Sequence, residues 1–361
     1  MNAAAPGLGS SLIARVLKFG YANARVKAMK TGLLGEKDMG ALLDAKSIDE
    51  AYSLLEKTQY RQDMVAGSLK GKTAADQIEF ALSRNFSGAM KKIMRISPKE
   101  VRPVLLGLFE KYEINNLKII ILAKHLGHAK EQFAPYIMDV GVLSRGRLQK
   151  AIEAKGVKEA AIELGGTEYG SALAKAMKGY DKDKDPVHLL AALDDYYYSK
   201  LAGIDAGPYG GERAIGKMAR AQADAKNISS VLRAKKEGLS EEKAMKSIIG
   251  HGSVSKDRLR LAAGAKNVEE SAKHFERDFS LGKAIESYKK NGSIIPLETA
   301  VEKAVAKKGL KLLRNSVLSV GAIAGFLCLK EEEISNIRKI VRAKEFSIPP
   351  SELQEMIVQI W

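Results

Sequence analysis

The sequence has 361 residues and a formal net charge of +16, because 59 lysines and arginines stand against 43 acidic residues. Charged residues make up 28%, which excludes a membrane-embedded chain, and 45% apolar residues exclude intrinsic disorder. The single cysteine, Cys328, excludes a disulfide framework and a cysteine zinc site and suits a reducing, cytosolic setting. The positive charge leaves nucleic acid, an anionic membrane surface and an acidic protein open as partners.

We expect no targeting or membrane-spanning segment. The short apolar stretch at residues 12–14 is followed at once by Arg15 and then by Lys18, whereas a secretory signal needs about 7–15 uninterrupted apolar residues. The most apolar window, Ser316–Leu329, is shorter than the roughly 20 residues that cross a bilayer. That window therefore predicts a buried helix, and the protein is expected to remain on the side of the membrane where it is made.

Helices are predicted along the whole chain. Helix starts are indicated by Ser97-Pro98-Lys99-Glu100, by Asp185-Pro186 and by the capping box Ser351-Glu352-Leu353-Gln354. Apolar residues recur at steps of three and four, and no segment sustains strict alternation. With an aromatic share of only 6%, the pattern favours an all-α fold. The charged run Asp181–Asp185 is predicted to be a solvated linker.

One segment recurs three times. In each copy an acid precedes an asparagine by three positions, aliphatic residues follow it at one, four and five, and Ala and Lys follow at seven and eight. The asparagines are Asn116, Asn227 and Asn336, which are 111 and 109 residues apart. This spacing indicates one helical unit of about 110 residues used three times.

Two further landmarks keep the same register. Thr58-Gln59-Tyr60 lies 58 residues before its asparagine, Thr167-Glu168-Tyr169 lies 60 before, and Arg277-Asp278-Phe279 lies 59 before. Helices matching one another are predicted to open at three aliphatic residues upstream of these landmarks: Ile48, Val157 and Val268. The triplication predicts a leader at 1–17 and helical units at 18–140, 141–250 and 251–361.

A structural role is predicted for the repeated helix. Its acid and its lysine are expected near opposite ends, where each complements the helix dipole. The amide of each repeated asparagine is expected to bond the end of a neighbouring helix rather than a ligand. Three units of this length suggest a body with a pseudo-three-fold axis, which suits a partner that also has an axis.

The opening Tyr21-Ala22-Asn23-Ala24-Arg25-Val26-Lys27-Ala28-Met29-Lys30 and the repeated landmarks resemble the family of C subunits of archaeal and bacterial A/V-type rotary ATPases. This family is the counterpart of the d-type subunits of eukaryotic V-ATPases. The resemblance spans about residues 18–361. It implies a funnel-shaped, all-helical, non-catalytic body that lies between the soluble central shaft and the membrane ring of proteolipid subunits and transmits torque.

The resemblance also indicates candidate structural and interface residues. Tyr21, Asn23 and Arg25 are expected to hold the start of the first repeat, and the three asparagine-bearing helices to form a scaffold around the axis. Arg233 and Arg342 occupy matching places in two copies, but the first copy has Leu122 there. The two arginines are therefore not expected to form a symmetric contact set.

The sequence predicts no active site. The segment Gly67–Thr73 has three residues between its glycines where a phosphate loop needs four, so a surface loop with Thr73 as a helix cap is expected. His125 and His128 lack a further ligand nearby, and His251 does not fit a nucleophile turn. Cys328 is interpreted as a small apolar residue. The repeated acids are interpreted as surface or packing residues, at Glu79, Asp194 and Glu298.

We therefore predict a rotor subunit with no catalytic residue, cofactor, metal or small-molecule substrate, bound peripherally at the cytoplasmic face of the cell membrane. Its expected partners are the proteolipid ring and the central shaft. Two alternatives compete with this prediction. An RNA-binding helical repeat protein is suggested by pairs such as Lys235-Lys236 and Lys307-Lys308, but it would need base-reading side chains at a fixed place in short repeats. An enzyme with a metal or phosphate site is the other alternative.

Overall fold

The computed structural model describes residues 8–66, 73–138, 140–204, 211–316 and 318–359. Within these ranges every regular element is an α-helix or a short 3₁₀ helix and no strand is present, which confirms the all-α prediction. The first part of the chain forms α1 (Leu8–Lys30), α2 (Glu36–Asp44), α3 (Ile48–Leu55), α4 (Arg61–Ala66), α5 (Ala74–Ile96), η1 (Lys99–Val101), α6 (Arg102–His125), α7 (Lys130–Phe133) and η2 (Ala134–Tyr136).

The rest of the described chain continues in the same manner. The middle part forms α8 (Arg145–Glu153), α9 (Val157–Glu163), α10 (Glu168–Asp183), α11 (Val187–Ala202), α12 (Glu212–Lys236) and α13 (Glu241–Lys246). The last part forms α14 (Lys256–Gly264), α15 (Val268–Lys273), α16 (Glu276–Phe279), α17 (Gly282–Asn291), α18 (Ile295–Asn315), α19 (Val320–Glu345) and α20 (Pro350–Met356). The helix starts predicted at Ile48, Val157 and Val268 are confirmed.

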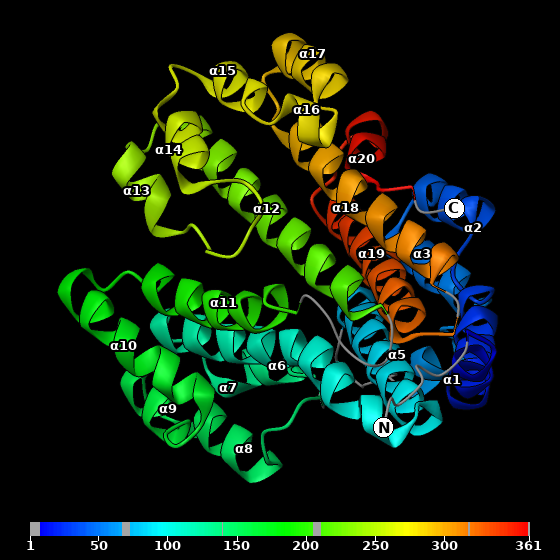
Figure 1. Cartoon of the computed structure of the whole chain (residues 1–361). Helices are drawn as coiled ribbons and strands as arrows, with labels where there is room; N and C mark the ends of the chain where they lie inside the picture. The colour runs from blue at the N-terminus through cyan, green and yellow to red at the C-terminus, as the bar shows by residue number, and fades with distance from the viewer. Residues whose placement is uncertain (1–7, 67–72, 139, 205–210, 317, 360–361) are drawn as a thin grey trace.

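Three long helices, α6, α12 and α19, organise the molecule. Figure 1 shows them spreading apart from a common region, and their first halves meet there: Leu108, Met218 and Leu327 line one small cavity. Three other helices pack across the gaps between them, α5 on α19, α11 on α6 and α18 on α12. The long helices are therefore bridged by helices from other parts of the sequence.

Two of the four predicted helix caps, at Thr73 and Asp185, are in place. Thr73 caps α5 by accepting a hydrogen bond from the Asp76 amide, and Asp185 accepts one from the Val187 amide at the start of α11. Two predicted caps were wrong. Ser97 is the C-cap residue of α5, and a 3₁₀ turn separates it from α6. Ser351 lies inside α20, which begins at Pro350. Proline is favoured in the first helical turn, so Pro350 sets that start.

The segment predicted as a linker, Asp181–Asp185, is partly helical. Helix α10 continues to Asp183 and ends at Lys184, whose φ of 58° is left-handed. The run is solvated, as expected, but an exposed run of charges does not by itself stop a helix. A residue in the left-handed conformation is a common helix terminus, and Lys184 ends α10 in this way.

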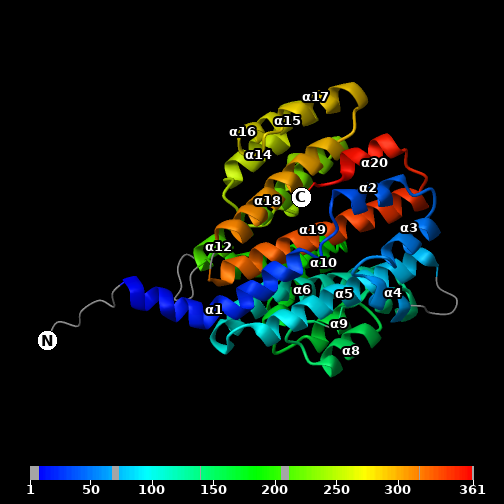
Figure 2. The ribbon, with the colours of Figure 1, turned by 90° about the vertical axis from the view of Figure 1, so that its right-hand side faces the viewer.

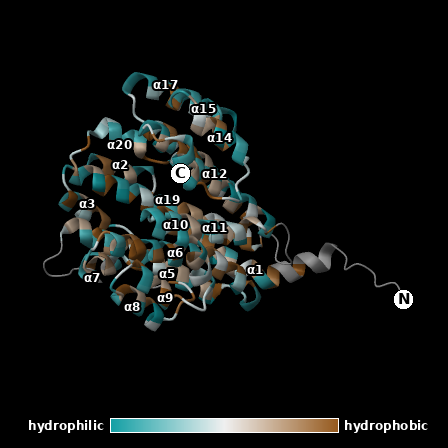
Figure 3. Ribbon diagram, turned by 90° about the vertical axis from the view of Figure 1, so that its left-hand side faces the viewer, coloured by the Kyte–Doolittle hydropathy of each residue, from teal (hydrophilic) through white to brown (hydrophobic). Residues whose placement is uncertain are grey.

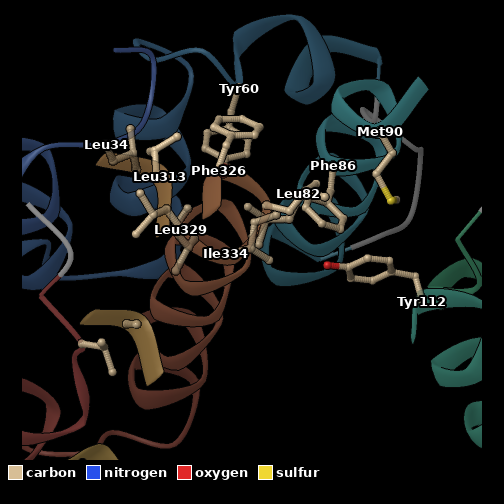
Figure 4. Packing of buried hydrophobic residues seen from close by; sticks show 14 of the residues in the cluster. Leu34, Tyr60, Leu82, Phe86, Met90, Tyr112, Leu313, Phe326, Leu329 and Ile334 are labelled. Carbon is tan, nitrogen blue, oxygen red and sulfur yellow. The ribbon is translucent and has the colours of Figure 1, made fainter. Parts of the chain in front are cut away.

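The apolar window predicted as a buried helix forms the first half of α19, where residues 320–330 are all buried. Figure 4 shows Phe326 and Leu329 of α19 in the same cluster as Tyr60, Leu82 and Phe86. This cluster joins residues between Phe19 and Tyr112 to residues between Ala306 and Val358. The two ends of the chain therefore share one core.

Helices α18 and α19 approach each other closely at a glycine. A Cβ at Gly325 would lie 2.5 Å from the backbone nitrogen of Leu313, so only glycine allows this approach. Among the described residues, none of the helices combines the length and the apolarity that crossing a bilayer requires.

Candidate functional site

The three repeated asparagines make the same contact. Each lies on a long helix with at most 1% of its surface exposed. Each amide donates to a backbone carbonyl and accepts from the backbone N–H of the same residue, 22 positions later: Asn116 with Met138, Asn227 with Ile249 and Asn336 with Val358, at 2.7–3.0 Å. The bonded segments follow η2, α13 and α20, so the predicted bond to a neighbouring helix end is confirmed to within two or three residues.

Replacing Asn227 by Ala is expected to lower the free energy of unfolding by about 2–3 kcal/mol, because the buried N–H and C=O of Ile249 would both lose their partner. Urea unfolding of the full chain measures the change. The matched control is Asn315→Ala, which removes an exposed amide at the end of α18. Equal stability of the two variants would contradict the role of Asn227.

The repeated acids were misplaced by the sequence prediction. Glu113, Asp224 and Glu333 lie in the middle of their long helices with 1%, 3% and 0% exposure, and not near a helix start. They accept hydrogen bonds from backbone amides of distant segments, Glu113 from Leu143 at 2.6 Å, Asp224 from Val254 at 2.9 Å and Glu333 from Leu34 at 2.5 Å. The long helices begin earlier than expected, so these acids hold loops instead of complementing a dipole.

The tyrosine of the second landmark bonds the same acids. The Tyr169 hydroxyl donates to Glu113 at 2.6 Å, and the Tyr60 hydroxyl donates to Glu333 at 2.5 Å. Phe279, at the third landmark, is buried but has no hydroxyl. Asp224 therefore has fewer donors than the other two acids, and burial raises its pKa against the lowering effect of the backbone amide of Val254.

Glu333 lies in a buried charged cluster that the sequence analysis missed. Lys330 Nζ is 2.6 Å from Glu333 Oε1 and 2.9 Å from the Tyr60 hydroxyl, and all three residues are at most 1% exposed. Burial lowers the pKa of Lys330, and Glu333 opposes that effect. The spacing Lys-x-x-Glu directly after the apolar run that ends at Leu329 was the available signal for this pair.

Of the three residues predicted to hold the start of the first repeat, one is buried and two are exposed. Asn23 is 4% exposed, and its amide donates to the Ser319 carbonyl at 3.1 Å and accepts from the Ser319 N–H at 3.3 Å. It therefore ties α1 to the start of α19. Tyr21 and Arg25 are exposed on the same helix, so they do not hold the start in that way. They remain predicted interface residues.

The second set of repeated acids forms ion pairs between the long helices and the bridging helices. Arg338 on α19 lies 2.5 Å from Glu79, and Arg233 on α12 lies 2.5 Å from Glu298. Asp194 on α11 binds Lys118 at 2.6 Å and Lys226 at 2.9 Å. These acids were interpreted as surface or packing residues, and the structure adds their partners.

The two candidate arginines have different surroundings. Arg233 pairs with Glu298 of α18, whereas Arg342 pairs with Glu345 of its own helix. Leu122, at the matching place in α6, is 40% exposed. The expectation that they do not form a symmetric set agrees with these contacts.

Two hollows open between the long helices. One has a volume of about 750 Å³ and is lined by residues of α5, α6 and α19, including Glu79, Leu122, Ser335 and Arg338. The other, of about 390 Å³, is lined by residues of α11, α12 and α18, including Asp194 and Ser229. Both hollows are open and carry charges of both signs, which suits contact with a protein surface.

The described residues contain no group of three or more histidine, cysteine or acidic side chains that could hold a metal. His125 lies 3.3 Å from the Tyr180 hydroxyl, and burial raises the pKa of the Cys328 thiol to about 12, so that thiol is unreactive at neutral pH. Residues 67–72 of the glycine-containing segment lie outside the described residues.

Comparison with known proteins identifies the family. A family model described as "ATP synthase (C/AC39) subunit" matches residues 22–356. The chain belongs to this family. It is 28% identical to the C subunit of the A-type ATP synthase of Methanocaldococcus jannaschii, over 97% of this chain and 89% of the relative. It is 26% identical to the protein of the same name from Pyrococcus furiosus, over 97% of this chain and 93% of the relative.

Proposed function

We propose that this member of the ATP synthase (C/AC39) subunit family is a non-catalytic rotor subunit in the central stalk of an A/V-type ATP synthase or ATPase. In this role it joins the soluble central shaft to the membrane proteolipid ring and transmits torque for ion translocation. The assignment rests on the full-length match to proteins named as C subunits of A-type ATP synthases. The relatives give no support to the RNA-binding alternative, which we do not retain.

We propose further that the chain is a triplication with units at 18–140, 141–250 and 251–361 after a leader at 1–17, arranged as a funnel about a pseudo-three-fold axis. The recurring asparagine contact supports three equivalent long helices. The acid contacts support a closed ring of units, because Glu113 and Asp224 bind segments about 30 residues ahead while Glu333 binds Leu34 near the start of the chain. The bridging helices follow the same cyclic order.

Such a body suits torque transfer because its buried contacts resist shear between the units. Asn23, Glu333 and Lys344 all bond residues about 300 positions away, which ties the last long helix to the first part of the chain. A closed ring has no free end at which twisting could start to separate the helices. The hollows between the long helices are the surface that we assign to the shaft.

Because the hollows are assigned to the shaft, we assign the region where α6, α12 and α19 converge to the side that faces the membrane. We propose a peripheral position at the cytoplasmic face of the cell membrane, with the ring as partner there. Tyr21 on α1 is exposed and stays a candidate interface residue. Neither nucleic acid nor a small-molecule substrate is part of the proposal.

Site-specific crosslinking tests the assignment. Cys328 is buried and unreactive, so a new surface cysteine would be the reactive thiol among the described residues. We expect Ser335→Cys and Ser229→Cys, which lie in the two hollows, to crosslink to shaft proteins in the purified complex. Ser53→Cys, exposed on α3, is the matched control. A tagged chain that never enters a complex with the ring and the shaft would refute the function.

A further inference from the structure

Two segments of the chain that lie close together in the fold contain lysines and arginines but no acidic residue. Residues 1–35 hold five lysines and arginines and residues 303–329 hold another five, with no Asp or Glu in either segment. These segments contribute α1, the second half of α18 and the start of α19. No acid within these segments offsets their ten positive charges.

Helix α1 carries an exposed apolar stripe. Ile13, Val16, Leu17 and Tyr21 are 62%, 48%, 82% and 66% exposed, and their spacing places them along one side of the helix. Phe19 and Val26 of the same helix are buried in the body. Figure 2 shows α1 leaving the body at its N-terminal end, and Figure 3 shows hydrophobic residues on α1 close to where it leaves. Large exposed apolar side chains gathered in this way mark a contact surface.

A basic hollow lies at the start of α12 and the end of α18. It has a volume of about 680 Å³, and the cations that line it are Lys217, Arg220, Lys308 and Lys311. Its described lining contains Ser253, Asn315 and Ser316 and no carboxylate. Lys217 and Lys311 are exposed. Four cations with hydroxyl and amide groups and no acid fit phosphate groups better than a neutral ligand.

The stripe and the hollow occur at the same end of the molecule. Asn23 of α1 is bonded to Ser319, three residues after Ser316 in the hollow. A Cβ on Gly211, next to the first residue of α12, would lie 2.8 Å from the Gly321 backbone nitrogen. Figure 2 shows the outer end of α1, the start of α12 and the end of α18 at one side of the body. One surface therefore combines an apolar helix with clustered cations.

We propose that this end of the protein binds directly to the surface of an anionic lipid bilayer. The stripe of α1 enters the headgroup region, and the cations of the hollow bind lipid phosphates. An apolar stripe beside cations is the pattern of segments that lie on a membrane surface. Glu100, an exposed acid beside α1, lies 3.7 Å from Lys18 and offsets that one lysine, whereas the described lining of the hollow has no carboxylate. The inference rests on the proposed function in one respect, which is that the rotor role places the protein beside a membrane.

Vesicle co-sedimentation of the purified full chain tests the inference. The probes are vesicles of phosphatidylcholine alone and vesicles containing phosphatidylglycerol at about one lipid in three. We expect strong binding to the anionic vesicles, weak binding to the neutral ones, and release at about 0.5 M salt. Lys217→Glu with Lys311→Glu should lower the affinity by roughly tenfold or more, since each cation near the surface contributes appreciably. Ile13→Ser with Leu17→Ser should also lower it by roughly tenfold or more.

Matched variants control for charge and apolarity elsewhere. Lys175→Glu with Lys178→Glu makes the same charge change on exposed positions of α10, and Ile162→Ser with Leu261→Ser removes side chains that are 73% and 63% exposed. Both controls should bind within twofold of the unaltered chain. Equal binding to both kinds of vesicle, or equal losses in test and control variants, would overturn the inference. Assembly with ring and shaft but no vesicle binding would overturn it and leave the rotor function intact.

Discussion

Replacing Glu333 by Leu is expected to lower the free energy of unfolding by about 3–5 kcal/mol, the range for removing one partner of a buried ion pair. The variant would leave the ammonium group of Lys330 buried beside the Tyr60 hydroxyl with no counter-charge. It would also remove the acceptor of the Leu34 N–H, which joins the start of the chain to α19. Urea unfolding at pH 7, followed by circular dichroism, measures the loss.

A second substitution separates charge from shape in this cluster. In Glu333→Leu with Lys330→Met both charges are gone, so we expect the double variant to recover most of the lost stability. Tyr60→Phe removes only a hydroxyl and should cost about 1–2 kcal/mol. A double variant as unstable as Glu333→Leu alone would show that the buried charge of Lys330 does not cause the loss.

The repeated motif is visible in the sequence because its signals are local. Acid, asparagine, aliphatic and lysine positions lie within twelve residues of one another on one helix, so their spacing survives in each copy. The asparagine contact could be predicted in kind for the same reason. Its partner 22 residues later was not predicted, although an isoleucine precedes that partner in each copy, at Ile137, Ile248 and Ile357. Only the backbone of the partner is bonded, so its side chain gives no direct signal of the contact.

The contacts that join distant segments could not be predicted. Glu333 bonds Tyr60, which is 273 residues away, and no periodicity of the sequence encodes that closure. The mistaken position of the repeated acids has a simpler cause. The dipole argument assumed that each long helix starts near its acid, although the apolar spacing before Glu113 already extended the helix by several turns. Serine and proline also mark helix ends and interior turns, so Ser97 and Ser351 were ambiguous signals.

Replacing Glu332 by Gln is expected to change the free energy of unfolding of the isolated protein differently at two pH values. The change should be more stabilising at pH 8 than at pH 5, by roughly 2–3 kcal/mol. Glu332 lines the larger hollow, and its Oε1 has no hydrogen-bond partner among the described residues. Burial raises the pKa of this carboxyl from its ordinary value of 4.5 to about 7, with Glu302 and Glu331 adding to the effect and Lys339 opposing it.

The sign of the pH dependence follows from proton binding. Between pH 4.5 and about 7 the folded protein holds a proton on Glu332 that the unfolded chain has lost, so stability falls as the pH rises through this window. Glutamine carries no charge, and its variant should lack this part of the slope. Groups that do not interact with Glu332, such as Asp224, contribute equally to the slope in both proteins. Urea unfolding of the pair at pH 5 and pH 8 therefore measures the contribution of Glu332.

The neighbouring residue provides the control. Glu331 lies 2.8 Å from Lys111, so Glu331→Gln removes a real partner and should destabilise the protein by about 1–3 kcal/mol at both pH values. The same substitution at adjacent positions of α19 is thus expected to have opposite effects at pH 8. Loss of stability in Glu332→Gln at pH 8 would mean that the carboxylate of Glu332 is charged and paired in solution.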